Sequence, residues 1–178
     1  MFKLGVATAA VAATVMGFVL VGNSQADDLS KRVAFPAGYE TTFKNYVSLD
    51  RTGNDDQIIR LFANEQAVKA AQAGEALPDG SVLVGEIYKA KKNEKGEVIE
   101  SGLGRRIRGK FAAVAVMEKR AGWGDAFSDD LKNGDWDFAI FSPSGERLTK
   151  KNVDSCRSCH APLKDTQHMF SLEHLAGK

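Results

Sequence analysis

Residues 43–63 read FKNYVSLDRTGNDDQIIRLFA, and this stretch decides which class of fold the chain adopts. Its two ends, Phe43 to Asp50 and Gln57 to Ala63, are short, aromatic or β-branched, and bounded by Gly, Asn and Asp. We expect both to be β-strands. Asn64, directly after them, can cap a short helix over 65–73 that Gly74 closes.

Three more segments further along the chain have strand character. Pro78-Asp79-Gly80 is a turn that leads into a strand over 81–89, and residues 92–97 form a polar, hairpin-like loop. Residues 110–118 (KFAAVAVME) are apolar with no helix cap, and residues 136–142 (WDFAIFS) alternate. These patterns predict two further strands.

Helices are short wherever the sequence indicates them. Residues 122–134 hold a short turn or helix, and no amphipathic stretch exceeds three turns, whereas a four-helix bundle needs four long helices. The predicted fold class is therefore α+β: one domain with a mainly antiparallel sheet and a few short helices.

The N-terminal residues 1–26 differ from the rest. Lys3 gives a positive start, residues 4–21 are uncharged and apolar, and Ser24-Gln25-Ala26 resembles a cleavage site. A membrane anchor is the alternative, but the Ala/Gly-rich composition and the cleavage-like tripeptide favour export. We expect a signal peptide over 1–26, cleaved near Ala26, and a single periplasmic domain over 27–178.

The two cysteines lie in Cys156-Arg157-Ser158-Cys159-His160, a C-x-x-C-H sequence. On a helical turn residues i, i+3 and i+4 share a face, so two thiols can bond the two vinyl groups of one haem while the imidazole reaches the iron. Asp154 or Ser155 is expected to cap this helix. The motif predicts one covalent haem c (heme c), bound by Cys156 and Cys159, with His160 as an axial iron ligand.

Three alternative origins of the motif fit the sequence less well. A thioredoxin-like disulfide belongs in a βαβ context that is missing here, and a structural zinc site wants four ligands, while only His168 and His174 remain. Chance does not account for the motif occurring together with an export signal and no other cysteine. The haem-attachment helix is therefore expected near the C-terminus.

The second axial position of the iron has no convincing ligand. Met169 follows His160 by nine residues, a segment too short to pass easily around the haem edge, and Met117 sits in an apolar strand-like run. We expect a five-coordinate iron.

Charge excludes some partners. Of the 24 basic residues Lys3 alone lies in 1–26, which leaves 23 basic and 23 acidic residues and a net charge of zero. This balance argues against binding to nucleic acid. The basic clusters 89–92 and 105–108 are expected at solvated edges; for the second, contact with haem propionates or with an acidic redox partner is the alternative.

Several segments together resemble the cytochrome P460 family of mono-haem c-type proteins, which are known for oxidising hydroxylamine. They are, in chain order, Phe35-Pro36-Ala37-Gly38-Tyr39, Ile59-Arg60-Leu61-Phe62-Ala63-Asn64, Leu77-Pro78-Asp79-Gly80-Ser81-Val82, Ala115-Val116-Met117-Glu118-Lys119, Trp136-Asp137-Phe138, the haem motif and His168-Met169-Phe170-Ser171. The resemblance covers nearly all of residues 27–178. It implies a sheet-rich fold, a homodimer, a proximal histidine and an open distal face.

The resemblance also assigns roles to single positions. The oxidising members carry a lysine bonded to the porphyrin, and this chain has Gly85 there; Lys89 lies roughly 13 Å further along an extended strand, at about 3.3 Å per residue. This departure favours relatives without the crosslink, such as cytochrome c-prime-beta. Arg60 matches a distal arginine, with a surface or propionate pair as the alternative. Glu118 falls near a distal carboxylate that accepts protons, although the alignment needs a gap there.

The aromatic residues Phe62, Phe111, Trp136 and Phe138 are expected in the core, where one or more can wall the distal pocket. Two functions follow. The first is binding of nitric oxide or a similar small ligand, and the second is oxidation of hydroxylamine or nitric oxide with electrons passed to another cytochrome. Simple electron transfer at a saturated iron ranks third because no sixth ligand is evident.

Overall fold

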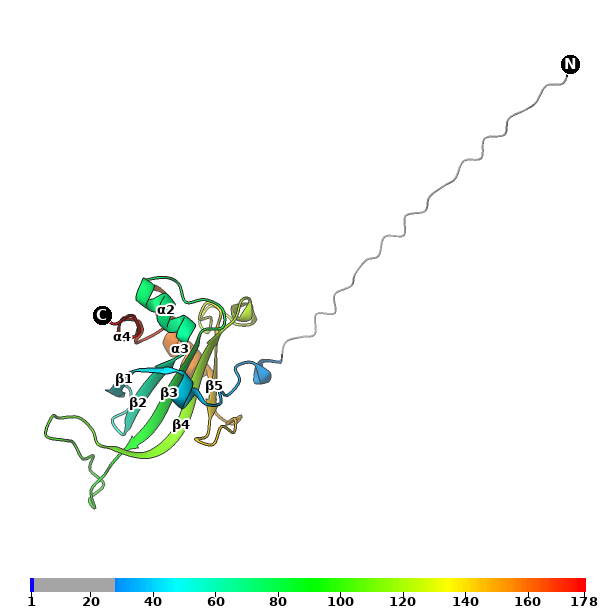
Figure 1. Cartoon of the computed structure of the whole chain (residues 1–178). Helices are drawn as coiled ribbons and strands as arrows, with labels where there is room; N and C mark the ends of the chain where they lie inside the picture. The colour runs from blue at the N-terminus through cyan, green and yellow to red at the C-terminus, as the bar shows by residue number, and fades with distance from the viewer. Residues whose placement is uncertain (2–27) are drawn as a thin grey trace.

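The computed structural model describes Met1 and residues 28–178, so the predicted signal peptide lies outside the described residues except for Met1. Its centre is a five-stranded antiparallel sheet in which each strand pairs with the one before it in the chain (Figure 1). The strands are β1 (Lys44–Asp50), β2 (Gln57–Ala63), β3 (Val82–Ala90), β4 (Arg108–Lys119) and β5 (Trp136–Phe141). All five predicted strands are confirmed within two residues at each end.

The helices are short, and the three α-helices that follow β2 and β5 lie near one end of the sheet (Figure 1). The α-helices are α1 (Tyr39–Thr42), α2 (Glu65–Ala73), α3 (Asp154–His160) and α4 (Leu172–Ala176), and the 3₁₀ turns are η1 (Leu29–Lys31), η2 (Trp123–Ala126) and η3 (Lys164–Thr166). The α+β class is therefore confirmed. Among the described residues no helix has the length and apolar character needed to cross a bilayer.

Both ends of α2 follow the expected chemistry. The Asn64 side chain accepts a hydrogen bond from the Ala67 amide at 3.3 Å, and Gly74 ends the helix at φ 73°. The same Asn64 oxygen accepts from the Val82 amide at 3.2 Å, and its amide group donates to the Gly80 carbonyl at 2.8 Å. One side chain thus joins the start of α2 to the start of β3.

The predicted cap of α3 is wrong. Asp154 and Ser155 are not capping residues, because Val153 precedes the first turn and Asp154 already belongs to the helix. The Asp154 amide is instead satisfied by the Asn152 side chain at 2.9 Å, and the Asp154 carboxylate pairs with Arg157. The Asp154 carboxylate thus bonds the Arg157 side chain and not a free backbone amide of the first turn.

The two faces of the sheet carry separate apolar cores, because successive side chains of a strand point to opposite faces. The first core contains Tyr39 and Val33 from the N-terminal segment and side chains of β2 to β5, among them Phe62, Val84, Val116 and Phe141. The second core lies under α2 and α4 and contains Ala63, Leu83, Trp136, Met169 and Leu175. The N-terminal segment thus covers one face of the sheet, and α2 and α4 cover the other.

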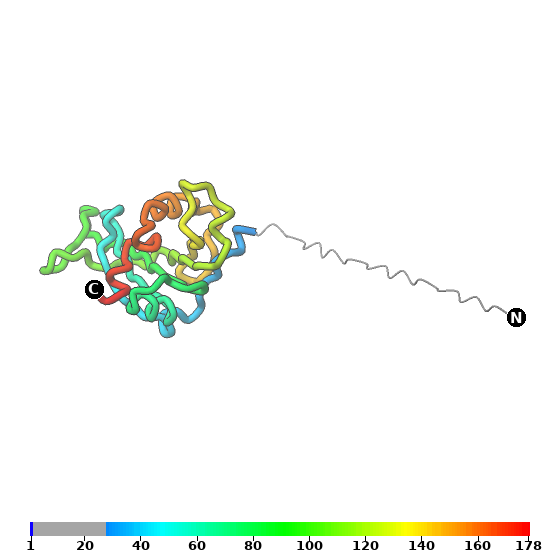
Figure 2. Tube along the Cα trace, turned by 90° about the horizontal axis from the view of Figure 1, so that it is seen from above, coloured from blue at the N-terminus to red at the C-terminus, as the bar shows by residue number. Residues whose placement is uncertain are grey.

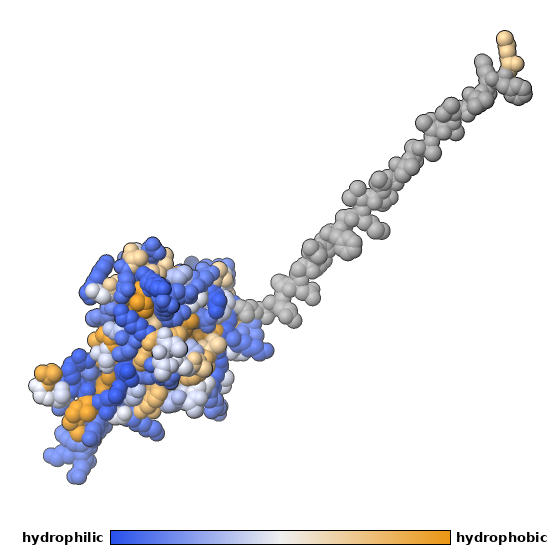
Figure 3. Space-filling view, in the orientation of Figure 1, coloured by the Kyte–Doolittle hydropathy of each residue, from blue (hydrophilic) through white to orange (hydrophobic). Residues whose placement is uncertain are grey.

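The segment 91–107 between β3 and β4, named the arm here, projects from the body (Figures 1 and 2). Bridges pair Lys92 with Val98 and Glu100 with Arg106, so the predicted hairpin-like loop over 92–97 is confirmed. Apolar residues show on this projection in Figure 3, and Leu103 is 89% exposed.

Arg106 holds the arm to the β1–β2 turn. Its guanidinium donates to the carbonyl oxygens of Arg51, Asn54 and Gln57 at 3.0 to 3.1 Å and to the Asp55 carboxylate at 3.1 Å. Arg105 pairs with Asp50 at 3.0 Å in the same place. Two cations of the cluster 105–108 are therefore paired with groups of the protein itself.

Candidate functional site

Helix α3 presents the cysteines and His160 together. Cys156 is half-buried, Cys159 is exposed, His160 is half-buried, and both thiols are free. Positions 156, 159 and 160 share one helical face, as their spacing predicts. Burial raises the pKa of the Cys156 thiol, which keeps it protonated near neutral pH.

The imidazole of His160 is fixed by one hydrogen bond and two ring contacts. Its Nδ1 lies 2.7 Å from the carbonyl oxygen of His168, and because a carbonyl only accepts, Nδ1 carries the proton. The rings of Phe138 and Phe170 meet it edge-on at 5.1 and 4.9 Å between centroids. Nε2 is left as the nitrogen with a free lone pair, which is the form that ligates a metal.

The loop after α3 bends sharply to supply that carbonyl. Gln167 and His168 both adopt left-handed backbone conformations, at φ 52° and 62°, and the His168 amide donates to the Leu163 carbonyl at 2.6 Å. Burial lowers the pKa of His160, opposed by the hydrogen bond to His168. The neutral imidazole is therefore favoured.

Beside His160 the sheet offers an open apolar surface, named the floor here. Phe138 contacts His160 and is paired with Met117, and the next row of paired residues on that face runs across all five strands. That row is Val47, Leu61, Gly85, Ala115 and Ile140, and the following row is Leu49, Ile59, Ile87 and Ala113. Apart from the buried Gly85, these residues are half-buried, so the floor is apolar and accessible.

Gly85 lies in the middle of the floor. A Cβ atom there would approach Ile59 Cδ1 at 3.0 Å and Leu61 Cδ2 at 3.4 Å, so a side chain at this position would emerge on the floor. Lys89 is exposed at the end of the strand and pairs with Gln57. The β3–β4 pairing shifts register around Tyr88, yet the β2–β3 pairing runs unbroken from Gln57 to Ala63, so Lys89 stays displaced from Gly85.

Arg60 and Glu118 lie on the other face of the sheet, away from His160. Arg60 pairs with the buried Glu86 at 3.0 Å and its guanidinium stacks over Phe62, which belongs to the first core. Glu118 is buried and pairs with Arg120 at 2.7 Å. The structure does not bring either residue to the floor, because their strand positions have the opposite parity. Their roles in ligand chemistry stay predictions without geometric support.

The aromatic and methionine candidates are also divided between the two cores and the surroundings of His160. Phe62 and Trp136 are buried in the first and second core respectively, and Phe111 stacks on Tyr88 at 4.8 Å. Met169 is 2% exposed in the second core, against which Met117 packs. Phe138 alone among the four aromatic candidates contacts His160.

Three contributors to the site were missed from the sequence. They are the carbonyl of His168, the ring of Phe170, which is 62% exposed, and the buried pair Asp137–Arg157 behind α3. His168 and Phe170 both lie in the segment 168–171 that resembles the family, and this could have indicated that they belong to the site. A backbone carbonyl, in contrast, has no sequence signature.

A sheet domain whose last helices present two free thiols beside a neutral imidazole, next to an apolar floor, has the features of a c-type haem protein. The family model Cytochrome P460 matches residues 36–171. The chain belongs to the Cytochrome P460 family. No curated protein matches the chain.

Members of this family bind one covalent haem c, and the residues present fit that group. Two thiols and an Nε2 with a free lone pair share one face of α3, and the floor supplies apolar contact for a flat ring. Within residues 28–178 no group of three or more His, Cys, Asp or Glu side chains is placed to hold a metal ion directly. Cys156, Cys159 and His160 are thus the residues that would hold the haem.

Proposed function

We propose that the protein is an exported mono-haem cytochrome that binds nitric oxide or a similar small neutral ligand. In this proposal Cys156 and Cys159 form the two thioether bonds, and His160 is the one protein ligand of the iron. Bound haem c would supply an iron with a further position for an external ligand.

The observation that carries the proposal is the composition of the floor. Its two rows contain aliphatic side chains and Gly85, none of which can ligate iron. Met169, the nearest methionine after the motif, is packed in the second core, where its backbone is held by Thr166 through bonds of 3.0 and 2.6 Å. An apolar surface without a competing base suits an uncharged diatomic ligand.

The residues around His160 prepare it for this role. The His168 carbonyl keeps the proton on Nδ1, and the edge-on contacts of Phe138 and Phe170 restrict rotation of the ring. The half-buried aliphatic side chains of the floor would exclude water from a bound haem.

The second candidate function is oxidation of hydroxylamine or nitric oxide, with transfer of electrons to another cytochrome. Family membership favours it, whereas Gly85 and the absence of a carboxylate from the two floor rows do not. A lysine crosslink at Gly85 is chemically impossible. Lys89 lies at the end of the strand, which is why we place this function second.

Purified holoprotein from the periplasm tests the proposal. We expect a high-spin ferrous spectrum, rapid changes on stopped-flow mixing with nitric oxide, and little turnover of hydroxylamine with an added electron acceptor. Proteolysis should leave the haem on the peptide that contains Cys156 and Cys159 alone. A low-spin ferrous spectrum that nitric oxide does not change would overturn the proposal, and a second haem-bound peptide with a lysine would favour the oxidase.

A further inference from the structure

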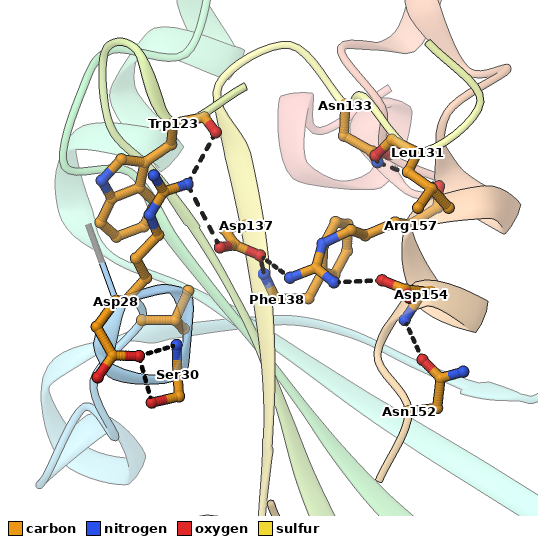
Figure 4. Close-up of polar contacts among 12 residues, drawn as sticks. Asp28, Ser30, Trp123, Leu131, Asn133, Asp137, Phe138, Asn152, Asp154 and Arg157 are labelled. Carbon is orange, nitrogen blue, oxygen red and sulfur yellow. Dashed lines mark hydrogen bonds and ion pairs between the residues drawn. The ribbon is translucent and has the colours of Figure 1, made fainter. Parts of the chain in front are cut away.

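The residue that follows the first cysteine points away from the haem side. Arg157 is buried, with 7% of its side chain exposed, and its guanidinium bridges two carboxylates: Asp137 on β5 at 2.5 Å and Asp154 on α3 at 2.6 Å (Figure 4). Attachment of haem requires only the two cysteines and the histidine at their spacing. Haem attachment therefore does not explain why Arg157 is buried.

The surroundings of the pair make its geometry specific. The guanidinium of Arg157 lies over the ring of Phe127 at 4.3 Å, and the Arg157 carbonyl accepts from the Asn133 side chain at 3.1 Å. Asp137 is 1% exposed, accepts from the Phe138 amide at 2.7 Å, and has Arg32 at 3.9 Å from its second oxygen. Figure 4 shows Asp137 on β5 with Arg157 on one side and Trp123, whose carbonyl accepts from Arg32, on the other.

Net stability does not account for such a pair. Two charges removed from water lose hydration about as large as their mutual attraction, so buried ion pairs contribute little net stability, while loss of one partner costs about 3–5 kcal/mol. Here the second oxygen of Asp137 and the Nε of Arg157 make no hydrogen bond, which lowers the net contribution further. A directional ion pair of this kind selects one position of α3 on β5 but adds little to the free energy of unfolding.

The neighbour of Asp137 connects this pair to the axial ligand. Asp137 and Phe138 are consecutive on β5, so their side chains point to opposite faces of the sheet. Asp137 holds Arg157 on one face and Phe138 contacts the His160 ring on the other. Two residues of α3, Arg157 and His160, therefore contact opposite faces of the edge strand β5.

We propose that Asp137 is a positioning residue for the axial ligand: through Arg157 it fixes α3 on β5 and so sets the position of the His160 imidazole against Phe138. The inference rests on His160 being the iron ligand, as in the proposed function. It does not depend on which gas is bound.

The test compares holoprotein variants in the ferrous state without added gas. Asp137→Leu removes the hydrogen-bonded ion pair with Arg157, and Asp137→Asn keeps an oxygen acceptor of the same shape. Asp154→Asn is the matched control because it changes the exposed partner of the same arginine. The readouts are the iron–histidine stretching band in resonance Raman spectra, the reduction potential, and the urea unfolding midpoint.

We expect Asp137→Leu to shift and broaden the iron–histidine band and to change the potential, Asp137→Asn to retain most of the wild-type band, and Asp154→Asn to leave it unchanged. The double variant Asp137→Leu/Arg157→Met should regain part of the stability, because neither charge of the Asp137–Arg157 pair is left without the other, although Arg32 loses its 3.9 Å contact with Asp137. It should keep the altered band. If Asp137→Leu does not fold, the double variant decides in its place.

An unaltered band and potential in a destabilised variant would show a purely structural role and overturn the inference. A wild-type protein without any iron–histidine band would instead refute ligation by His160 with an open iron position, which belongs to the proposed function. The two failures are therefore distinguishable.

Discussion

At the scale of the residue, His160 shows how three neighbours act on different properties of one ring. The His168 carbonyl fixes the tautomer, Phe138 and Phe170 fix the orientation, and burial lowers the pKa. None of these neighbours is adjacent to His160 in the sequence. A change in any of them should thus alter the ligand without altering the haem-attachment motif.

Met169 is expected to act as a core residue and not as an iron ligand. Met169→Ala should lower the free energy of unfolding by about 2–5 kcal/mol, because it leaves a cavity in the second core, whereas Met169→Leu should cost less than about 1.5 kcal/mol. Both variants should keep the wild-type ferrous spectrum. Urea unfolding and optical spectra check this, and a change of spin state in Met169→Leu would show ligation instead.

Tyr46 should make stability depend on alkaline pH. Burial raises its pKa to about 12, opposed by the hydrogen bond that its hydroxyl shares with Ser171. The unfolded chain releases this proton near pH 10, so the stabilisation is complete below about pH 10 and is lost as the pH rises towards 12. The urea midpoint of the wild type should fall between about pH 8 and about pH 11 by more than that of Tyr46→Phe. Equal falls in both proteins would contradict the assignment.

At the scale of the element, α2 depends on one side chain at its start. Asn64 bonds the Ala67 amide, the Val82 amide and the Gly80 carbonyl, so it stabilises the helix and its attachment to β3 together. Short helices are not stable alone and need such tertiary contacts. The cap of α2 thus supports the second core, which α2 covers.

Asn64→Ala should destabilise the protein by about 1–2 kcal/mol, the upper range for a lost N-cap, because it also leaves the Val82 amide without its partner. Gln72→Ala, on the exposed side of the same helix, is the control and should change stability by less than about 0.5 kcal/mol. Thermal or urea unfolding measures both. Similar losses in the two variants would mean that helix propensity, and not the cap, determines the effect.

Local sequence patterns were enough to predict the strands and helices, but not which face of the sheet each side chain occupies. Strands, the α2 cap and the haem motif depend on neighbouring residues and were found. Arg60 and Glu118 lie on the face of the sheet opposite His160, and their roles in ligand chemistry stay predictions. The sequence could not show their face, because it depends on strand parity relative to His160, which reaches the sheet from far along the chain. A shift of one residue exchanges the faces of a strand, so an alignment with a gap cannot fix them.

At the scale of the whole molecule, most residues of the arm are exposed. Arg106 holds it through three carbonyl bonds and one ion pair to the β1–β2 turn. Its tip carries exposed apolar residues such as Leu103. The homodimer implied by the family resemblance stays a prediction, which the sedimentation coefficient of the holoprotein can test.

Arg106→Ala should loosen the arm without changing the haem site. Peptides from residues 91–107 are expected to exchange amide hydrogens faster, because the guanidinium bonds that close the arm onto the turn are lost. Lys95→Ala, at an exposed position of the same arm, is the control. Hydrogen-exchange mass spectrometry measures the effect, and unchanged protection of the arm in Arg106→Ala would refute this role.

The sequential order of the five strands has a consequence for how the chain matures. Each strand can pair with its predecessor as soon as it is available, so the sheet needs few long loop closures before it forms. Helix α3 has to wait for β5, since Asp137 and Phe138, which hold it, lie there. The two thiols therefore lie on a segment that docks only after the last strand of the sheet is in place, so an assembling chain keeps them exposed while the strands pair.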